Sequence, residues 1–230
     1  MGKAVRVLST LAVQGALPAL IARFEAPKGA KITSDFAPTN GLLARIKAGE
    51  TADIAILTRE GVDELARLGI LRDGTIVDLA LSLVGIAVKA GARKPDIGTA
   101  EALKDALLAA KSIAYSRIGA SGVLFAQLIE RLGVADAVNA KASILPSGLT
   151  GELVARGEVE IAVQQLSELM LVPGLDIVGP LPATLQTPTT ISAAVFAGSA
   201  PTGLAGEFLR ALASAEAAAA FKAAGLEPAR

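Results

Sequence analysis

The 230-residue chain contains no cysteine and no histidine. Without cysteine, the protein has no disulfide, no zinc–thiolate site and no thiol nucleophile. Without histidine, it lacks serine–histidine triads, imidazole metal ligands and imidazole general bases. A reaction that moves a proton would therefore depend on Asp, Glu, Lys, the single tyrosine Tyr115 or a bound water.

Aromatic residues are also scarce, at 3%, whereas 52% of the residues are hydrophobic. The 22 basic and 22 acidic side chains give a formal net charge of zero. That balance is not typical of a nucleic-acid binder with a broad basic field, so we expect no nucleic-acid partner. The longest apolar run, over residues 75–92, is interrupted by Asp78, Gly85 and Lys89. Because a spanning helix needs about 20 apolar residues, we expect no membrane insertion.

The first residues show a strand-like pattern instead of an apolar stretch followed by a small-residue cleavage site. We therefore expect a cytoplasmic protein from the sequence as it stands, or a periplasmic protein if a signal peptide was removed. In the second case, an ABC permease is an expected partner.

Short apolar strands alternate with helical segments along the chain. Strands are predicted at 4–9, 31–36 and 52–57, followed by helices at 13–25, 40–48 and 59–68. This order predicts a parallel sheet covered by helices, and a second α/β unit follows, beginning with one long strand over 81–89. The sequence thus predicts an α/β fold of two lobes with mixed or parallel sheets, flanked by helices and joined by crossing segments near 81–84 and 189–193. The predicted lobes are residues 1–81 plus 191–230 and residues 82–190.

Ligands of open parallel sheets bind beyond the carboxyl ends of the strands, where helix N-termini point. In this sequence, the turns at those positions carry hydroxyls, amides and small residues. Helix N-termini add unpaired backbone donors and a partial positive charge, so the set suits a small anion. The candidate ligand-binding residues are Ser9, Thr10, Leu11, Thr39, Asn40, Arg117, Ala120, Ser121, Ser147 and Gln164.

Five of these candidates have a structural alternative. Thr39, Asn40 and Ser121 could be plain helix caps. Arg117 could form a surface salt bridge instead of a bidentate contact to a carboxylate. Gln164, at the end of an apolar strand, indicates a polar cleft, with an exposed sheet edge as the alternative. No pair of carboxylates stands out as an acid/base couple, and the sequence indicates no catalytic residue, no metal site and no cofactor.

Five motifs are spread along nearly the whole chain: DFAPTNGL at 35–42, IKAGETADIAI at 46–56, GASG at 119–122, ARGEVEIAV at 155–163 and ASAEAAAAFKAAGL at 213–226. In this order they resemble the molybdate-binding component of ABC transporters, which belongs to the type 2 periplasmic binding proteins. The resemblance implies two lobes with a hinge, and an oxyanion held between them by neutral donors.

The resemblance also shows departures in the ligand set. The family's first-turn serine falls on Ala12, its second hydroxyl on Thr39, and its late tyrosine on Gln164. Two side-chain donors are therefore lost, and each hydrogen bond to a charged ligand is worth about 1.5–3 kcal/mol. We expect weak or no molybdate binding, and Arg117, which has no counterpart in that set, indicates an organic carboxylate.

These features predict a monomeric solute-binding protein that captures a small anion, an oxyanion or an organic carboxylate, in an inter-lobe cleft. The alternative is a cytosolic enzyme on the same scaffold, such as a cofactor-independent isomerase of an organic acid. In that case Ser121, Arg117 or Tyr115 would orient the substrate. A sensory ligand domain is a third reading, and the sequence leaves open whether a reaction is catalysed.

Overall fold

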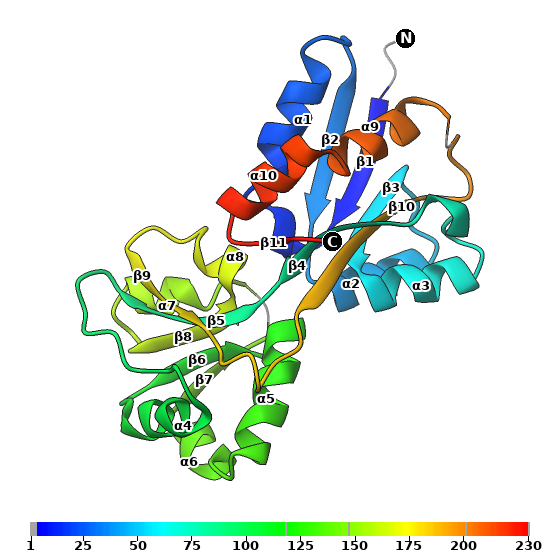
Figure 1. Ribbon diagram of the computed structural model, residues 1–230. Coiled ribbons are helices and arrows are strands. Elements are labelled where there is room, and N and C mark those ends of the chain that lie inside the picture. The colour runs from blue at the N-terminus through cyan, green and yellow to red at the C-terminus, as the bar shows by residue number, and fades with distance from the viewer. Residues whose placement is uncertain (1–3, 118, 147, 201, 230) are drawn as a thin grey trace. The chain divides into compact units, whose positions relative to one another are not determined.

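The structure, a computed structural model, describes residues 4–117, 119–146, 148–200 and 202–229 (Figure 1). The chain forms two compact units, unit 1 (Met1–Ser82 with Thr189–Arg230) and unit 2 (Leu83–Pro188). The chain passes between the units after Ser82 and again after Pro188. Each unit has its own sheet and its own hydrophobic core.

Unit 1 is built on a mixed sheet with the strand order β11-β4-β10-β3-β1-β2. Its strands are β1 (Ala4–Ser9), β2 (Lys31–Phe36), β3 (Ile54–Thr58), β4 (Val77–Ser82), β10 (Thr189–Val195) and β11 (Glu227–Pro228). β1 runs parallel to β2 and β3, whereas β10 runs antiparallel to β3 and β4. The carboxyl ends of β1, β2 and β3 therefore lie at one edge of the sheet.

Helices cover both faces of the unit 1 sheet (Figure 1). Its helical segments are η1 (Leu11–Val13), α1 (Leu17–Glu25), α2 (Thr39–Lys47), α3 (Arg59–Arg67), η2 (Asp73–Thr75), α9 (Leu204–Leu212) and α10 (Ala215–Ala223). In β3, Ile54 and Ile56 pack against α1, α9 and α10, while Ala55 and Leu57 pack against α2 and α3. Because successive strand residues face opposite sides, a strand that is buried on both faces is apolar throughout.

Unit 2 is built on a second mixed sheet with the strand order β7-β6-β8-β5-β9. Its strands are β5 (Val84–Lys89), β6 (Ile113–Ser116), β7 (Ala142–Leu145), β8 (Ile161–Gln165) and β9 (Leu175–Pro180). β6 runs parallel to β7 and β8, and β5 runs antiparallel to β8 and β9. The helices are α4 (Ala100–Ala109), α5 (Ala120–Arg131), α6 (Ala135–Asn139), α7 (Gly151–Ala155) and α8 (Leu166–Leu169).

The two faces of the unit 2 sheet differ in side-chain size. Ile113 and Tyr115 of β6 pack against α4, α5 and α6, where Phe125 is fully buried. On the other face, small residues such as Ala114 and Ala162 lie beneath the short helices α7 and α8. These alanines allow a close approach of α7 and α8 to the strand ends of β6 and β8.

The predicted α/β class, with two mixed sheets flanked by helices, is confirmed. The single strand predicted over 81–89 is wrong, because β4 ends at Ser82 and β5 begins at Val84 in a different sheet. The helix predicted over 13–25 begins later, at Leu17, and Pro18 lies in its first turn, where the missing amide is tolerated. The sequence analysis missed α6 and β7, and β7 is a partly exposed edge strand without a clear apolar alternation.

Among the residues that the structure describes, none of the helices combines the length and the apolar character that crossing a bilayer requires.

Candidate anion-binding site

The turns after β1, β2 and β3 are held together at one edge of unit 1. The Ala37 amide donates to the Ser9 carbonyl over 3.1 Å, and the Thr10 amide donates to the Ile56 carbonyl over 2.8 Å. Ser9 and Thr10 are both buried, and the Ser9 hydroxyl donates to the carbonyl of Thr10. The residues predicted at this edge are thus brought together by backbone pairing of neighbouring strands.

Helix α2 begins at the same edge. Its N-cap residue is Pro38, and no side chain caps the helix, so Thr39 is the first helical residue and not the cap. The Thr39 methyl group packs towards α3, 3.4 Å from where a Cβ on Gly61 would lie. Asn40 is exposed, and Leu11 opens the short helix η1 beside Thr10. Unit 1 therefore gathers the five candidates that the sequence analysis placed in it.

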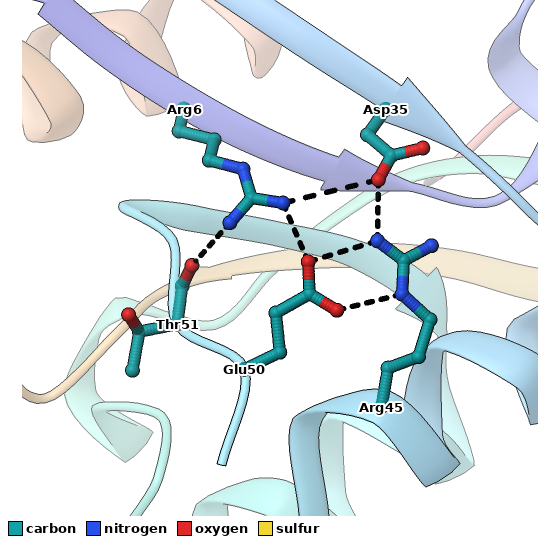
Figure 2. Close-up of polar contacts among 5 residues, drawn as sticks. All are labelled: Arg6, Asp35, Arg45, Glu50 and Thr51. Atoms are coloured by element: carbon teal, nitrogen blue, oxygen red, sulfur yellow. Dashed lines mark hydrogen bonds and ion pairs between the residues drawn. The ribbon is translucent and has the colours of Figure 1, made fainter. Parts of the chain in front are cut away.

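A separate cluster of charged side chains lies in unit 1 and is shown in Figure 2. Arg6 on β1 and Arg45 in the last turn of α2 share Glu50, with an Arg6 Nη2 to Glu50 Oε1 distance of 2.5 Å and an Arg45 Nε to Glu50 Oε2 distance of 2.6 Å. Arg45 also pairs with Asp35 on β2. Hydrogen bonds from Arg45 and Arg6 hold the pKa of Glu50 at about 2. Because these charges satisfy one another, the cluster ties α2 to β1 and β2 and is not a free anion site.

In unit 2, the first turn of α5 lies directly against the end of β6. An added Cβ on Gly122 would lie 1.9 Å from the Ser116 carbonyl oxygen and 2.6 Å from Ser116 Oγ. An added Cβ on Gly119, the N-cap residue of α5, would lie 2.7 Å from Ser116 Oγ. Only glycine permits this approach, which brings the Ser116 hydroxyl against the N-terminus of the helix.

This edge offers several donors that have no partner among the residues that the structure describes. Ser116 is 5% exposed, and its hydroxyl has no hydrogen-bond partner among the described residues. The amides of Gly122 and Val123 both donate to the Gly119 carbonyl over 3.0 Å. Within the described part of the chain, nothing accepts from the amides of Ala120 and Ser121, the first two helical residues. Ser121 is therefore not the N-cap, and its hydroxyl lies beside two open amides.

Gln164 fixes the turn on the other side of Ser116. β6 and β8 pair in parallel as far as Ala114 and Ala162, two residues before Ser116 and Gln164, so both side chains lie at the carboxyl ends of neighbouring strands. The Gln164 oxygen accepts from the Thr150 amide over 2.8 Å and from the Thr150 hydroxyl over 2.9 Å, and its Nε2 donates to the Gly148 carbonyl over 3.1 Å. Gln164 is 3% exposed on an interior strand, so an exposed sheet edge is excluded. Its amide positions the turn before α7.

The remaining candidates of unit 2 have different surroundings. Arg117 is exposed, its backbone amide donates to the Leu145 carbonyl over 2.8 Å, and no described carboxylate forms a salt bridge with it. Tyr115 is buried, and its hydroxyl donates to Asn139 over 2.7 Å. Burial raises the pKa of Tyr115, and the charge of Arg117 opposes that shift. Tyr115 thus belongs to the core, and the prediction that it orients a substrate finds no support. Ser147 lies outside the described residues.

The sequence analysis missed Glu168, the third residue of α8. It is 7% exposed and is the one charged side chain among the buried polar residues that the structure describes. Burial raises the pKa of Glu168 to about 7, and a hydrogen bond from Gln164 opposes this shift. The signal in the sequence was a glutamate three residues after the end of a fully buried strand, between the buried residues Ser167 and Leu169.

Two mixed sheets of this topology, each flanked by helices and linked by two passages of the chain, define a type 2 periplasmic binding protein. Residues 5–227 match the family model of bacterial extracellular solute-binding proteins. The chain belongs to this family.

Three known proteins illustrate the similarity. An aconitate isomerase from a Pseudomonas species is 36% identical over 228 residues, which cover 96% of this chain and 87% of that protein. The periplasmic molybdate-binding protein of Azotobacter vinelandii has a TM-score of 0.82 at 20% identity, covering 98% of this chain and 100% of that chain. The sulfate-binding protein of Mycobacterium tuberculosis has a TM-score of 0.79 at 16% identity, covering 98% and 87% of the two chains. The resemblance to molybdate-binding components is confirmed for the fold.

Glu168 makes the stability of the protein depend on pH. Its pKa is about 7 in the folded protein and 4.5 at its ordinary value. Between these values the folded state keeps a proton that the unfolded state has lost, so the free energy of unfolding falls as the pH rises through this range. The fall is about 3 kcal/mol and is complete above about pH 7. Glu168→Gln, which cannot ionise, is expected to remove it.

Urea unfolding at about pH 5 and about pH 8 measures this difference. Glu152→Gln on α7, where the side chain is exposed, is the matched control and should keep the pH dependence of the wild type. An identical pH dependence in wild type and Glu168→Gln would contradict the burial of an ionisable carboxyl group.

Proposed function

We propose that the edge of unit 2 at the start of α5 binds a carboxylate group of a small organic anion. The observation that carries this proposal is the buried Ser116 hydroxyl without a partner, placed against the N-terminus of a helix. An unsatisfied buried hydroxyl costs about 1–3 kcal/mol, which a ligand oxygen would recover. The open amides of Ala120 and Ser121 and the helix dipole favour a negative charge at the same point.

The chemistry of the ligand follows from two considerations. Ala12 offers no hydroxyl at the position where the family resemblance implies one, which weakens a tetrahedral oxyanion site. Arg117 is exposed beside the edge and is free to meet a second carboxylate of a larger anion. The aconitate isomerase relative, similar along almost the whole chain, supports an organic polycarboxylate over molybdate or sulfate.

The family description as extracellular solute-binding proteins supports the periplasmic alternative for this chain. An ABC permease is then the partner to which a bound solute would be delivered. One ligand shared by both units stays a prediction, as do the roles of Ser9, Thr10, Thr39 and Asn40.

A second candidate function is the isomerisation of aconitate, which the isomerase relative favours. Aconitate is a propene tricarboxylate, and moving a proton from its methylene carbon to its vinylic carbon shifts the double bond. The product is again aconitate, so the shift interconverts the two geometric isomers without an oxidant or a cofactor. The negative charge that develops spreads onto a carboxylate, where amide and hydroxyl donors stabilise it.

Removal of the Ser116 hydroxyl tests the binding site. Ser116→Ala is expected to weaken aconitate binding roughly 10- to 100-fold, because a hydrogen bond to a charged ligand is lost. The free energy of unfolding should not fall, since the hydroxyl has no hydrogen-bond partner among the described residues. Calorimetry of both aconitate isomers measures the affinity. Ser143→Ala, on the exposed part of β7, is the control and should bind like wild type. Equal affinity of Ser116→Ala and wild type would contradict the site.

Isomerisation is tested with the unmodified protein. Incubation of purified protein with trans-aconitate should produce cis-aconitate, and the reverse incubation should approach the same ratio of isomers. Chromatographic separation of the isomers over time measures both directions, with heat-denatured protein as the control. Binding of aconitate without any interconversion would leave a solute binder and contradict the isomerase function.

A further inference from the structure

The isomerisation requires a group that can take up and return a proton, and the composition leaves few candidates. Histidine and cysteine are absent, and the hydroxyl of Tyr115 donates to Asn139 in the core. Among the described residues, the buried polar side chains include one ionisable carboxyl group, that of Glu168.

Glu168 lies at the same sheet edge as the proposed carboxylate site. It sits in the first turn of α8, which follows β8 directly. It accepts a hydrogen bond from Gln164, and Gln164 bonds to Thr150 and Gly148. Gln164 and Ser116 lie at the carboxyl ends of the neighbouring parallel strands β8 and β6, and the Ser116 hydroxyl has no partner among the described residues. The Gln164 side chain therefore links the buried carboxyl group of Glu168 to the turn before α7, at the sheet edge where the ligand is proposed to bind.

No charged group in the described part of the chain contributes to the altered pKa of Glu168. Helix α8 packs against β5, β8 and β9, and the causes of its altered pKa include burial and Gln164 but no charged group. Lys89 is the last residue of β5, next to the first residues of β8, and therefore lies at the opposite end of these strands from α8. Asp176 on β9 pairs with Val88 near that same end and accepts from the Gly91 amide. A carboxyl group with a pKa of about 7 is poised to accept a proton and to release it near neutral pH.

We propose that the Glu168 carboxylate is the base that moves the proton in the isomerisation of aconitate, an inference that rests on the isomerase function proposed above. The carboxylate takes a proton from the methylene carbon, and the C–H electron pair forms a new double bond to the central carbon. The old double bond's electrons pass to its outer carbon and onto the attached carboxylate. The protonated Glu168 then returns the proton to that outer carbon, so a C–H bond forms and the free carboxylate is restored.

Glu168→Gln tests this role, because glutamine keeps the size of the side chain but cannot accept the proton. We expect kcat to fall at least about 100-fold while the affinity for both aconitate isomers changes less than about threefold. In D₂O, the wild type should exchange deuterium into the methylene group of aconitate, and Glu168→Gln should not. Wild-type kcat/KM should rise with pH up to about pH 7, the pKa of Glu168, and the residual rate of the variant should lack this dependence.

Two controls separate the possible outcomes. Glu152→Gln, exposed on α7, should keep wild-type rates, and Glu168→Asp, which retains a carboxylate, should recover part of the exchange. Wild-type protein that binds aconitate but neither interconverts its isomers nor exchanges deuterium would contradict the isomerase function, and this role with it. Exchange at equal rates in wild type and Glu168→Gln would contradict the role of Glu168 alone. A loss of affinity as large as the loss of rate would make Glu168 a positioning residue that acts through Gln164, and would overturn the proposal.

Discussion

The contact between the first turn of α5 and the end of β6 is the constraint on which the proposed site depends. Gly122 lies so close to Ser116 that any side chain at this position would collide with the backbone of the strand. At the N-cap position, a Cβ on Gly119 would lie 2.7 Å from Ser116 Oγ, which leaves little room for a capping side chain. The helix therefore begins with open amides beside a buried hydroxyl. Among the described residues, the fold thus leaves donors at a strand end without a partner, and a small anion is the species that we propose to bind them.

The charged side chains of unit 1 form ion pairs with one another, whereas unit 2 buries a carboxyl group without an ion pair among the described residues. In unit 1, Arg6, Arg45, Asp35 and Glu50 neutralise one another and hold α2 to the sheet. In unit 2, the donors proposed for the first carboxylate are the neutral Ser116 hydroxyl and two backbone amides, and no cation among the described residues contributes to the altered pKa of Glu168. Neutral donors bind an anion without a permanent ion pair, and a carboxyl group without a counter-charge changes its protonation easily. The same edge of the unit 2 sheet would thus hold both the donors that bind the anion and the carboxyl group that transfers the proton.

Much of the fold could be predicted from the sequence, because strands buried on both faces, such as β3 and β8, read as short apolar runs. The break at Leu83 could not, since β4 and β5 are both apolar and their separation depends on which sheet each one joins. The position of Gln164 at the end of an apolar strand could be predicted, but its partners in the turn before α7 required coordinates, and its place in a ligand cleft stays a prediction. Glu168 was missed because burial, not residue type, gives this carboxyl group its chemistry.

The central claim is that the open donors at the start of α5 bind a carboxylate. A crystal structure of the protein with trans-aconitate at saturating concentration tests it most directly. The account predicts a carboxylate oxygen within hydrogen-bond distance of Ser116 Oγ and of the amides of Ala120 and Ser121. A bound ligand held elsewhere, with the Ser116 hydroxyl still unpaired, would contradict the account.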